Sequence, residues 1–316
     1  MSKATLRADA INRFIVDAKS QGVYDALKAS CVMAGWDSLA GALTPLAGTA
    51  PTNNGFLAAD YDRGTGLKGD GSSKYLDSNR ANNADGRDDN HNSFFISAAG
   101  STNNEKYIGS ESSGTGVNTI GSTTSQALYS RSRCNTVTIE PTSTASAGFC
   151  GTSRATSDEF SFLYGGIVQS NSVASEAPDS LNIVVFGFSG PGSRGICTGR
   201  LCWYSIGESV DLAALDTLVS RLMSDFRSID EDGMDRDALA YIRNVEAADG
   251  GYLELGVKQA VDQFVRGCKY DGIWDAIKAS CILCGARTLA GALTPLAGTA
   301  PTNNNFVDAD YNRETG

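Results

Sequence analysis

Histidine is nearly absent from this chain, which has a single one, His91, among its 316 residues. It lies in the polar run Asp88-Asp89-Asn90-His91-Asn92, which predicts a solvated loop that enters a strand. A Ser-His-Asp catalytic unit needs a buried and oriented imidazole. The sequence therefore argues against nucleophilic hydrolysis of that kind.

Positive charge is also scarce, and long apolar runs are missing. The 26 Lys and Arg are outnumbered by 36 Asp and Glu, which gives a formal net charge of −10. Binding to a phosphate backbone needs clustered basic side chains, and a membrane span needs about 18 consecutive apolar residues. Met1 to Ile15 carries charges throughout, unlike a signal peptide. We therefore expect no nucleic acid or membrane partner and synthesis in a cytoplasm.

What the chain does contain is a copy of part of itself. Gly22 to Gly66 returns as Gly272 to Gly316 without a gap, and 31 of the 45 aligned residues are identical. A repeat with so long a period is typical of tandem whole domains and not of a solenoid, whose units run to about 20–50 residues. We expect one complete unit and the start of a second, which either a continuing chain or a partner completes; we favour the continuing chain.

The eight cysteines are too scattered to form a disulfide framework in a chain of this size. Cys281-x-x-Cys284 has the spacing of a metal or redox site, but its counterpart in the first copy is Cys31 and Ala34. Because the repeat does not need the second thiol, we interpret most of the cysteines as small buried hydrophobic residues.

The hydrophobic pattern changes twice along the chain. Residues 4–34 show helical spacing interrupted at Gly22, which predicts two short helices. From Leu39 to about Ser205 the pattern is one of short β-branched and aromatic runs between turn residues, which predicts a sandwich or barrel. Helical periodicity returns at 210–226, 237–248 and 252–269. We therefore expect an N-terminal helical segment over 1–38, a β-domain with a closing helix over 39–228, a helical linker over 229–285 and an incomplete second repeat over 286–316.

Two stretches carry a resemblance to a known family. Gly66 to Asp77 reads GLKGDGSSKYLD, and Gly199 to Ser209 reads GRLCWYSIGES. They resemble the opening and closing strands of laminin-G-like, concanavalin A-like jelly rolls. With TAPTNN-x-F and DADYNRETG, the chain is similar to tandem units of this kind in virion proteins of tailed bacteriophages. The resemblance implies a mainly β jelly-roll sandwich with flanking N- and C-terminal helices and a helical linker.

One loop is a candidate metal site. Asn82 to Asn90 contains Asp85, Asp88 and Asp89 together with amides and a turn glycine, and these are the oxygen ligands that Ca²⁺ takes. Calcium is also a frequent ligand of the laminin-G-like group. The spacing is not that of an EF-hand, and Arg87 lies among the acids, so a solvated loop is the alternative interpretation. No other cofactor is indicated.

Catalytic and sugar-binding patterns are weaker. Glycoside hydrolases need two carboxylates on either side of the scissile bond, but Asp158 and Glu159 are adjacent and therefore lie on opposite faces of a strand. Trp36, Tyr164 and Trp203 are aromatic candidates for stacking on a sugar, although Trp36 aligns with Ala286 and Trp203 lies in a strand that reads as core. We assign no catalytic residue.

These observations favour a non-enzymatic structural protein of a bacteriophage virion, a tail fibre or a head or tail appendage, made in the host cytoplasm. We expect it to contact other virion proteins and other copies of itself as a homo-oligomer, a trimer being one symmetric arrangement. A lectin-like module that binds host surface glycans is the alternative, and a polysaccharide depolymerase is a third hypothesis.

Overall fold

The computed structural model describes residues 1–112, 115–190 and 197–316, with the backbone alone for 139–144. The chain divides into two compact units, Met1–Phe226 and Arg227–Gly316.

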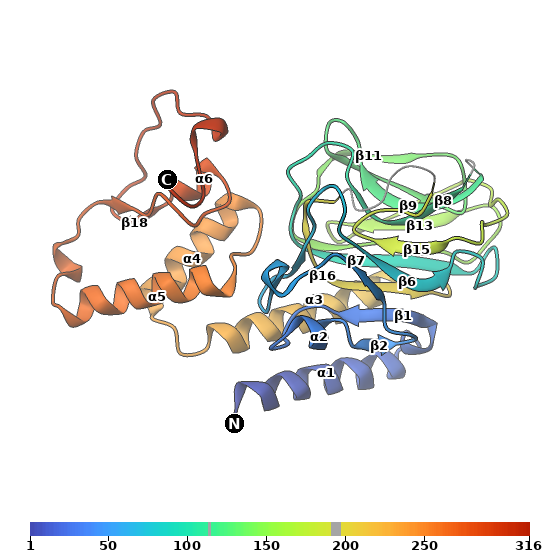
Figure 1. The fold of residues 1–316 in the computed structure, drawn as a ribbon, viewed down its shortest axis with the longest axis horizontal. Coiled ribbons are helices and arrows are strands. Elements are labelled where there is room, and N and C mark those ends of the chain that lie inside the picture. Colours follow the sequence, from blue (N-terminus) through green and yellow to red (C-terminus); the bar gives the residue numbers. More distant parts are fainter. Residues whose placement is uncertain (113–114, 191–196) are drawn as a thin grey trace. The chain divides into compact units, whose positions relative to one another are not determined.

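The first unit is a mainly β, jelly-roll-like sandwich of two antiparallel sheets (Figure 1). Within the described residues, the first sheet has the order β14-β13-β12-β7-β16-β1-β2, with β5 paired to β16 and β4 to β5. The second has the order β11-β10-β9-β8-β15-β6-β3. The mainly β jelly roll expected from the sequence is confirmed.

The strands of the first sheet are β1 (Leu27–Val32), β2 (Pro45–Ala47), β4 (Tyr61–Asp62), β5 (Gly66–Lys68), β7 (Asn90–Ala98), β12 (Gly148–Arg154), β13 (Phe160–Tyr164), β14 (Ile167–Asn171) and β16 (Arg200–Gly207). Those of the second are β3 (Thr52–Asn54), β6 (Tyr75–Ala81), β8 (Lys106–Ser112), β9 (Thr115–Ser122), β10 (Ala127–Ser132), β11 (Thr138–Thr144) and β15 (Asn182–Val185).

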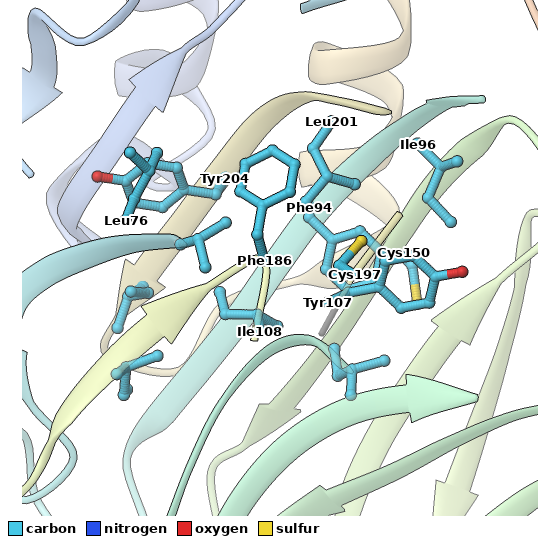
Figure 2. Close-up of a cluster of buried hydrophobic side chains, with 14 of the residues drawn as sticks. Leu76, Phe94, Ile96, Tyr107, Ile108, Cys150, Phe186, Cys197, Leu201 and Tyr204 are labelled. Atoms are coloured by element: carbon cyan, nitrogen blue, oxygen red, sulfur yellow. The ribbon is translucent and has the colours of Figure 1, made fainter. Parts of the chain in front are cut away.

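The core lies between the two sheets and is built from alternate residues of each strand (Figure 2). Successive side chains of a strand point to opposite faces, so Phe94 and Ile96 of β7 enter the core. The ring of Phe94 stacks on Tyr107 of β8 with centroids 5.1 Å apart. Tyr204 of β16 enters the same core, whereas its neighbour Trp203 points out of the sandwich toward a helix.

Two helices cover the outer face of the first sheet. They are α1 (Lys3–Ser20), whose N-terminus is capped by the Ser2 hydroxyl, and α3 (Leu212–Glu231). Phe14 of α1 places its ring edge-on against Trp203, with centroids 5.3 Å apart. An ion pair of 2.9 Å between Arg13 and Asp225 joins the two helices. A large aromatic contact therefore fixes α1 on the sheet.

The expectation of a second short helix within residues 1–38 is wrong. Tyr24–Ala26 form a single 3₁₀ turn, and the chain then enters the sandwich as β1, which pairs with β16 and β2. Of the apolar residues that suggested this helix, Val23 and Ala26 lie at the 3₁₀ turn and Leu27 begins the strand β1. Periodicity alone does not separate a strand that is buried on both faces from a buried helix.

The second unit contains the repeated segment preceded by a further helix. Its elements are α4 (Arg236–Asp249), α5 (Leu255–Tyr270), a 3₁₀ turn (Trp274–Ala276), β17 (Ser280–Cys281), α6 (Leu289–Ala292), β18 (Pro295–Ala297) and a second 3₁₀ turn (Asp308–Asp310). With the offset of 250, α5 corresponds to α1, and β17 and β18 correspond to β1 and β2. The pairs Ser280↔Ala297 and Cys281↔Pro295 reproduce the register of Ser30↔Ala47 and Cys31↔Pro45.

Local contacts are the same in both copies of the repeat. The Tyr61 hydroxyl donates to the Trp36 carbonyl oxygen at 2.7 Å, and Tyr311 donates to Ala286 at 2.8 Å. Gly48 has a φ of +78°, and a Cβ there would lie 2.0 Å from the Lys28 carbonyl oxygen. Gly298 repeats both features. Only glycine fits this turn, which explains why both copies have glycine at this position.

Among the described residues, no helix combines the length and the apolar character that a membrane crossing demands.

Phe14 and its repeat counterpart Phe264 offer a matched pair of substitutions. Phe14 is 1% exposed and Phe264 is 49% exposed. We expect Phe14→Ala to cost about 3–5 kcal/mol of unfolding free energy, since it removes a fully buried ring from Trp203. Phe264→Ala should cost about 1 kcal/mol or less. Urea unfolding followed by tryptophan fluorescence measures both values, and equal losses for the two variants would contradict this packing.

Candidate functional site

The acidic loop lies between β6 and β7, and each of its three carboxylates has a protein partner. Asp85 accepts from the Arg80 guanidinium, with Nε at 3.1 Å. Asp88 accepts from the hydroxyl of Ser175. Asp89 accepts from the backbone N–H of Ser209 at 2.6 Å. The carboxylates therefore tie the loop to three other segments of the first unit.

Two buried arginines hold the same end of the sandwich together. The guanidinium of Arg133, which is 1% exposed, donates to the carbonyl oxygens of Asn82, Asp85 and Gly86. Arg154 donates to the carbonyl oxygen of Ser132 at the end of β10 and to those of Thr156, Glu159 and Val173. Burial lowers the pKa of Arg133 to about 10, although the nearby Asp85 opposes this shift. Neutralisation by arginine and binding to backbone oxygens make this loop cluster a structural clamp.

The structure thus does not gather Asp85, Asp88 and Asp89 around one point. Among the described residues, no group of three or more His, Cys, Asp or Glu is placed to hold a metal ion. Of the two interpretations of the loop, neither is reproduced in full: the acids are neither joined into a calcium shell nor freely solvated. Calcium binding stays a prediction without geometric support.

His91 is not in a solvated loop, and that expectation is wrong. It belongs to β7 and is fully buried on the outer side of the first sheet. Its Nδ1 lies 2.5 Å from the Glu208 carbonyl oxygen and its Nε2 lies 2.9 Å from the Ser205 hydroxyl. Burial lowers the pKa of His91 to about 4, so the ring is neutral at pH 7.

The histidine ends a chain of hydrogen bonds that one proton arrangement satisfies throughout. The Trp203 indole donates to Ser93 Oγ at 3.2 Å, and the Ser93 and Ser205 hydroxyls are 2.7 Å apart. If each hydroxyl donates onward, Ser205 donates to Nε2, and Nδ1–H donates to Glu208. The network contains a serine hydroxyl bound to a histidine, as a catalytic pair does. Its hydrogen bonds satisfy polar groups that are buried beneath the helices.

The sequence did not predict this network, because its residues lie on two strands that are far apart in the sequence and adjacent in the sheet. His91 and Ser93 lie on β7, while Trp203 and Ser205 lie on β16, and the two strands pair as Ser93↔Ser205. A weak signal existed, since His91 and Ser93, like Trp203 and Ser205, have the i, i+2 spacing of one strand face.

The aromatic residues considered for sugar stacking are not exposed. Trp203 is fully buried, and Tyr164 is 8% exposed with its hydroxyl bound to Ser146. Trp36 is half-buried, and its indole Nε1 donates to the Val32 carbonyl oxygen at 2.7 Å. Trp203 and Tyr164 therefore present no open ring face to a ligand, whereas Trp36 lines a groove along α1.

The exposed apolar residues of the second copy are the feature that stands out. We call Phe264, Ile273, Leu283 and Phe306 the second-copy apolar set. They are 49%, 50%, 54% and 61% exposed, whereas their counterparts Phe14, Val23, Met33 and Phe56 are at most 3% exposed. The backbone N–H of Met33 donates to Cys202 of β16, and Phe56 packs on Phe186. Within the described part of the chain, no strand like β16 pairs with β17.

Comparison with known proteins adds little. No protein-family model matches the chain, and no curated protein matches it. Among solved structures, the chain is similar to the botulinum neurotoxin serotype D binding domain, with 15% identity and a TM-score of 0.41, over 62% of this chain and 51% of that one. It is similar to a mutant Trypanosoma rangeli sialidase with trans-sialidase activity, with 11% identity and a TM-score of 0.45, over 63% and 33%. A third is the binding domain of botulinum neurotoxin DC in complex with SialylT, with 14% identity and a TM-score of 0.42, over 63% and 52%.

The chain therefore spans about half, or only a third, of the length of these neighbours. At such identities and TM-scores they carry no argument about this chain, and its fold rests on its own strand pairing.

Calcium should leave the stability of this protein unchanged. Because Asp85, Asp88 and Asp89 are already engaged by Arg80, Ser175 and the Ser209 backbone, we expect excess Ca²⁺ or EDTA to shift the thermal midpoint by less than about 1 °C. Differential scanning calorimetry measures this. A stabilisation of several degrees by Ca²⁺ that Asp88→Asn abolishes would restore the metal site.

His91 should make the first unit sensitive to moderate acid. The unfolded imidazole takes up a proton near pH 6.5, while the folded one resists protonation until about pH 4. Stability is therefore complete above pH 6.5 and falls as the pH drops toward 4, by up to about 3 kcal/mol. Urea unfolding of the wild type and His91→Gln between pH 7 and 4 isolates this contribution. Parallel curves for the two proteins would contradict the assignment.

Proposed function

We propose that this chain is a non-enzymatic structural protein of a bacteriophage virion, a tail fibre or a head or tail appendage, that works by assembling with copies of itself and with other virion proteins. The observation that carries the proposal is the second-copy apolar set. Residues that a complete unit buries are presented to solvent by a segment with the same local hydrogen bonds.

The second-copy apolar set leaves apolar surface in contact with solvent, and covering that surface would release free energy. Fully burying an apolar side chain of this size contributes about 1.5–3 kcal/mol. The four side chains are about half exposed, so covering them contributes roughly 1 kcal/mol each. Side chains that are apolar in both copies and buried in the first are typical of a surface that another segment or a partner covers.

The absence of catalysis is part of the proposal. His91 is enclosed and neutral, and the three acids of the loop at 82–90 are engaged by the Arg80 guanidinium, the Ser175 hydroxyl and the Ser209 backbone N–H. A catalytic acid or base needs access to a substrate and a pKa near the working pH. The fold also hosts binding modules, so recognition of a host surface glycan is the alternative function.

The first test asks whether the second-copy apolar set associates. We expect the full chain to form a concentration-dependent homo-oligomer in light scattering coupled to size exclusion, and the double variant Phe264→Asp, Leu283→Asp to remain monomeric. Leu57→Asp is the matched control, because Leu57 is 66% exposed in the complete first copy. A chain that stays monomeric at high concentration, or a control that dissociates it equally, would count against assembly through this set.

The second test asks where the protein resides and what it does there. Antibodies against the chain should label particles in electron micrographs of a phage lysate from the strain that carries the gene. Glycan arrays with and without EDTA test the alternative, and release of reducing ends from capsule polysaccharide tests depolymerase activity. Unlabelled particles together with specific glycan binding would replace the virion role by the lectin role.

A further inference from the structure

Strand β14 is the last strand of the first sheet within the described part of the chain, where β13 is its one neighbour. Five consecutive residue pairs join the two strands without a bulge, and Tyr164↔Ile167 is the pair beside the turn. The turn residues Gly165 and Gly166 both have positive φ, as a type I′ turn requires. The outer edge of β14 is therefore a regular row of backbone groups.

The other three sheet ends are built differently. β2 and β3 are three residues long, and β2 begins with Pro45. β11 contains Glu140 and Pro141, and its pairing with β10 is interrupted by a register shift. Short strands, prolines, charges and bulges keep sheet edges from pairing with other chains. β14 has no such charge, proline or bulge, since residues 160–175 include neither a charged residue nor a proline.

The turn determines which backbone groups of β14 point outward. In a two-residue turn the flanking residues, here Tyr164 and Ile167, form a hydrogen-bonded pair. Hydrogen-bonded and non-bonded pairs alternate along antiparallel strands. Gln169 therefore also bonds to β13, while the N–H and C=O groups of Val168 and Ser170 face away from it.

We propose that the outer edge of β14 pairs with β14 of a second copy of this chain, antiparallel and about a two-fold axis at Gln169. In this register Val168 of one copy lies opposite Ser170 of the other, and the axis generates the reverse pair. The outward N–H and C=O groups of both residues then form about four hydrogen bonds between the copies. A contact of this kind uses the same surface on both copies and closes on itself.

Symmetry and charge favour a second copy as the occupant. The strand matches itself, because every outward group finds a partner in the same strand turned around the axis. The chain has a net charge of −10, so two copies repel each other. The uncharged β14 lets them meet without placing like charges in direct contact. Ile167 and Val168 are 67% and 47% exposed, and the paired strand covers part of this apolar surface.

The contact is small and therefore weak by itself. Two strands of five residues bury less than the roughly 1,000 Å² of a stable interface. The variant Phe264→Asp, Leu283→Asp is thus still expected to run as a monomer on a sizing column. A weak contact adds strength where another contact already joins two chains, because it is then intramolecular. The proposal does not depend on the virion role, since it rests on the backbone of the first unit.

Disulfide trapping detects such a weak pair. In the proposed register the two Gln169 Cα atoms lie about 4.5 Å apart, within the range of a disulfide. The two Ser170 residues lie diagonally, about 7–8 Å apart, where a disulfide needs backbone movement. Under mild oxidation at about 0.1 mM, Gln169→Cys should give a linked dimer at least about tenfold faster than Ser170→Cys. Random collision predicts the opposite order, because Ser170 is the more exposed residue.

Both cysteine variants carry Cys284→Ala. Cys284 is the exposed cysteine of the described chain, and the first copy has Ala34 at the corresponding position. Mass spectrometry of the linked peptides identifies the bonded residues.

Substitutions at Ser170 test the hydrogen bonds in the Gln169→Cys chain. Ser170→Pro removes the outward N–H, which a proline at a sheet edge does without breaking the ladder on the other side. Ser170→Ala keeps the N–H, and both variants lose the same hydroxyl contact, 2.8 Å from the Glu159 carboxylate. We expect proline to abolish the dimer and alanine to retain it. Val168→Glu leaves the backbone intact and brings a carboxylate toward the partner's Glu159, so it should also suppress the dimer.

Hydrogen–deuterium exchange gives an independent measurement on the unsubstituted chain. The amides of Val168 and Ser170 should exchange rapidly at low concentration and more slowly as the concentration rises. Three outcomes would overturn the proposal. One is Ser170→Cys dimerising as fast as Gln169→Cys, and another is a dimer that survives both Ser170→Pro and Val168→Glu. The third is protection of these amides at every concentration, which would mean that another segment of the same chain covers the edge.

Discussion

Strand β16 hydrogen-bonds to β7 along one edge and to β1 and β5 along the other. Its inward residues, Tyr204 among them, close the sandwich core, while the outward Trp203 receives Phe14 of α1. The strand thus joins three layers: the second sheet, the first sheet and the helices. Segments at opposite ends of the unit meet on it, so the leading helix and β1 are complete only when a strand of this kind is present.

The repeat shows what the leading segment does without such a strand. Both copies keep the same glycine turn, strand pair and tyrosine hydrogen bond, because these depend on residues within the segment itself. Burial differs, because it depends on residues outside it. The leading helix has apolar side chains on two faces. In α1, Phe14 is buried against the first sheet, while Ile11 and Ile15 are only half-buried. In α5, Val261 and Val265 are buried against α4, while Phe264 is exposed. The same sequence pattern therefore suits two neighbours.

The sequence was most informative where the contacts are local or periodic. The repeat, the closing helix and most strands of the sandwich follow from alternation and turn residues, and the jelly-roll class follows from the strand-rich pattern between helices. Residues 27–32 were included in the helical segment because Val23, Ala26 and Leu27 have helical spacing, but Leu27 instead begins a buried strand. His91 and Arg133 were misjudged or passed over for another reason. A polar residue near a turn is expected to be solvated. His91 is buried because β7 pairs with β16, and Arg133 is buried because the loop at 82–90 lies against it.

A buried network of ion pairs joins α4 to α5 in the second unit. Lys258 lies between Glu231 and Glu246, 2.9 and 2.8 Å from their carboxylates, and Arg227 pairs with the same two acids. Burial alone would raise the pKa of Glu231, but Lys258 and Arg227 together outweigh it and leave that pKa below its usual value. Buried ion pairs contribute little net stability, because desolvation offsets their attraction, whereas leaving one partner unpaired is costly. The network therefore fixes α4 against α5, because removal of Lys258 would leave the buried carboxylates of Glu231 and Glu246 short of a cation.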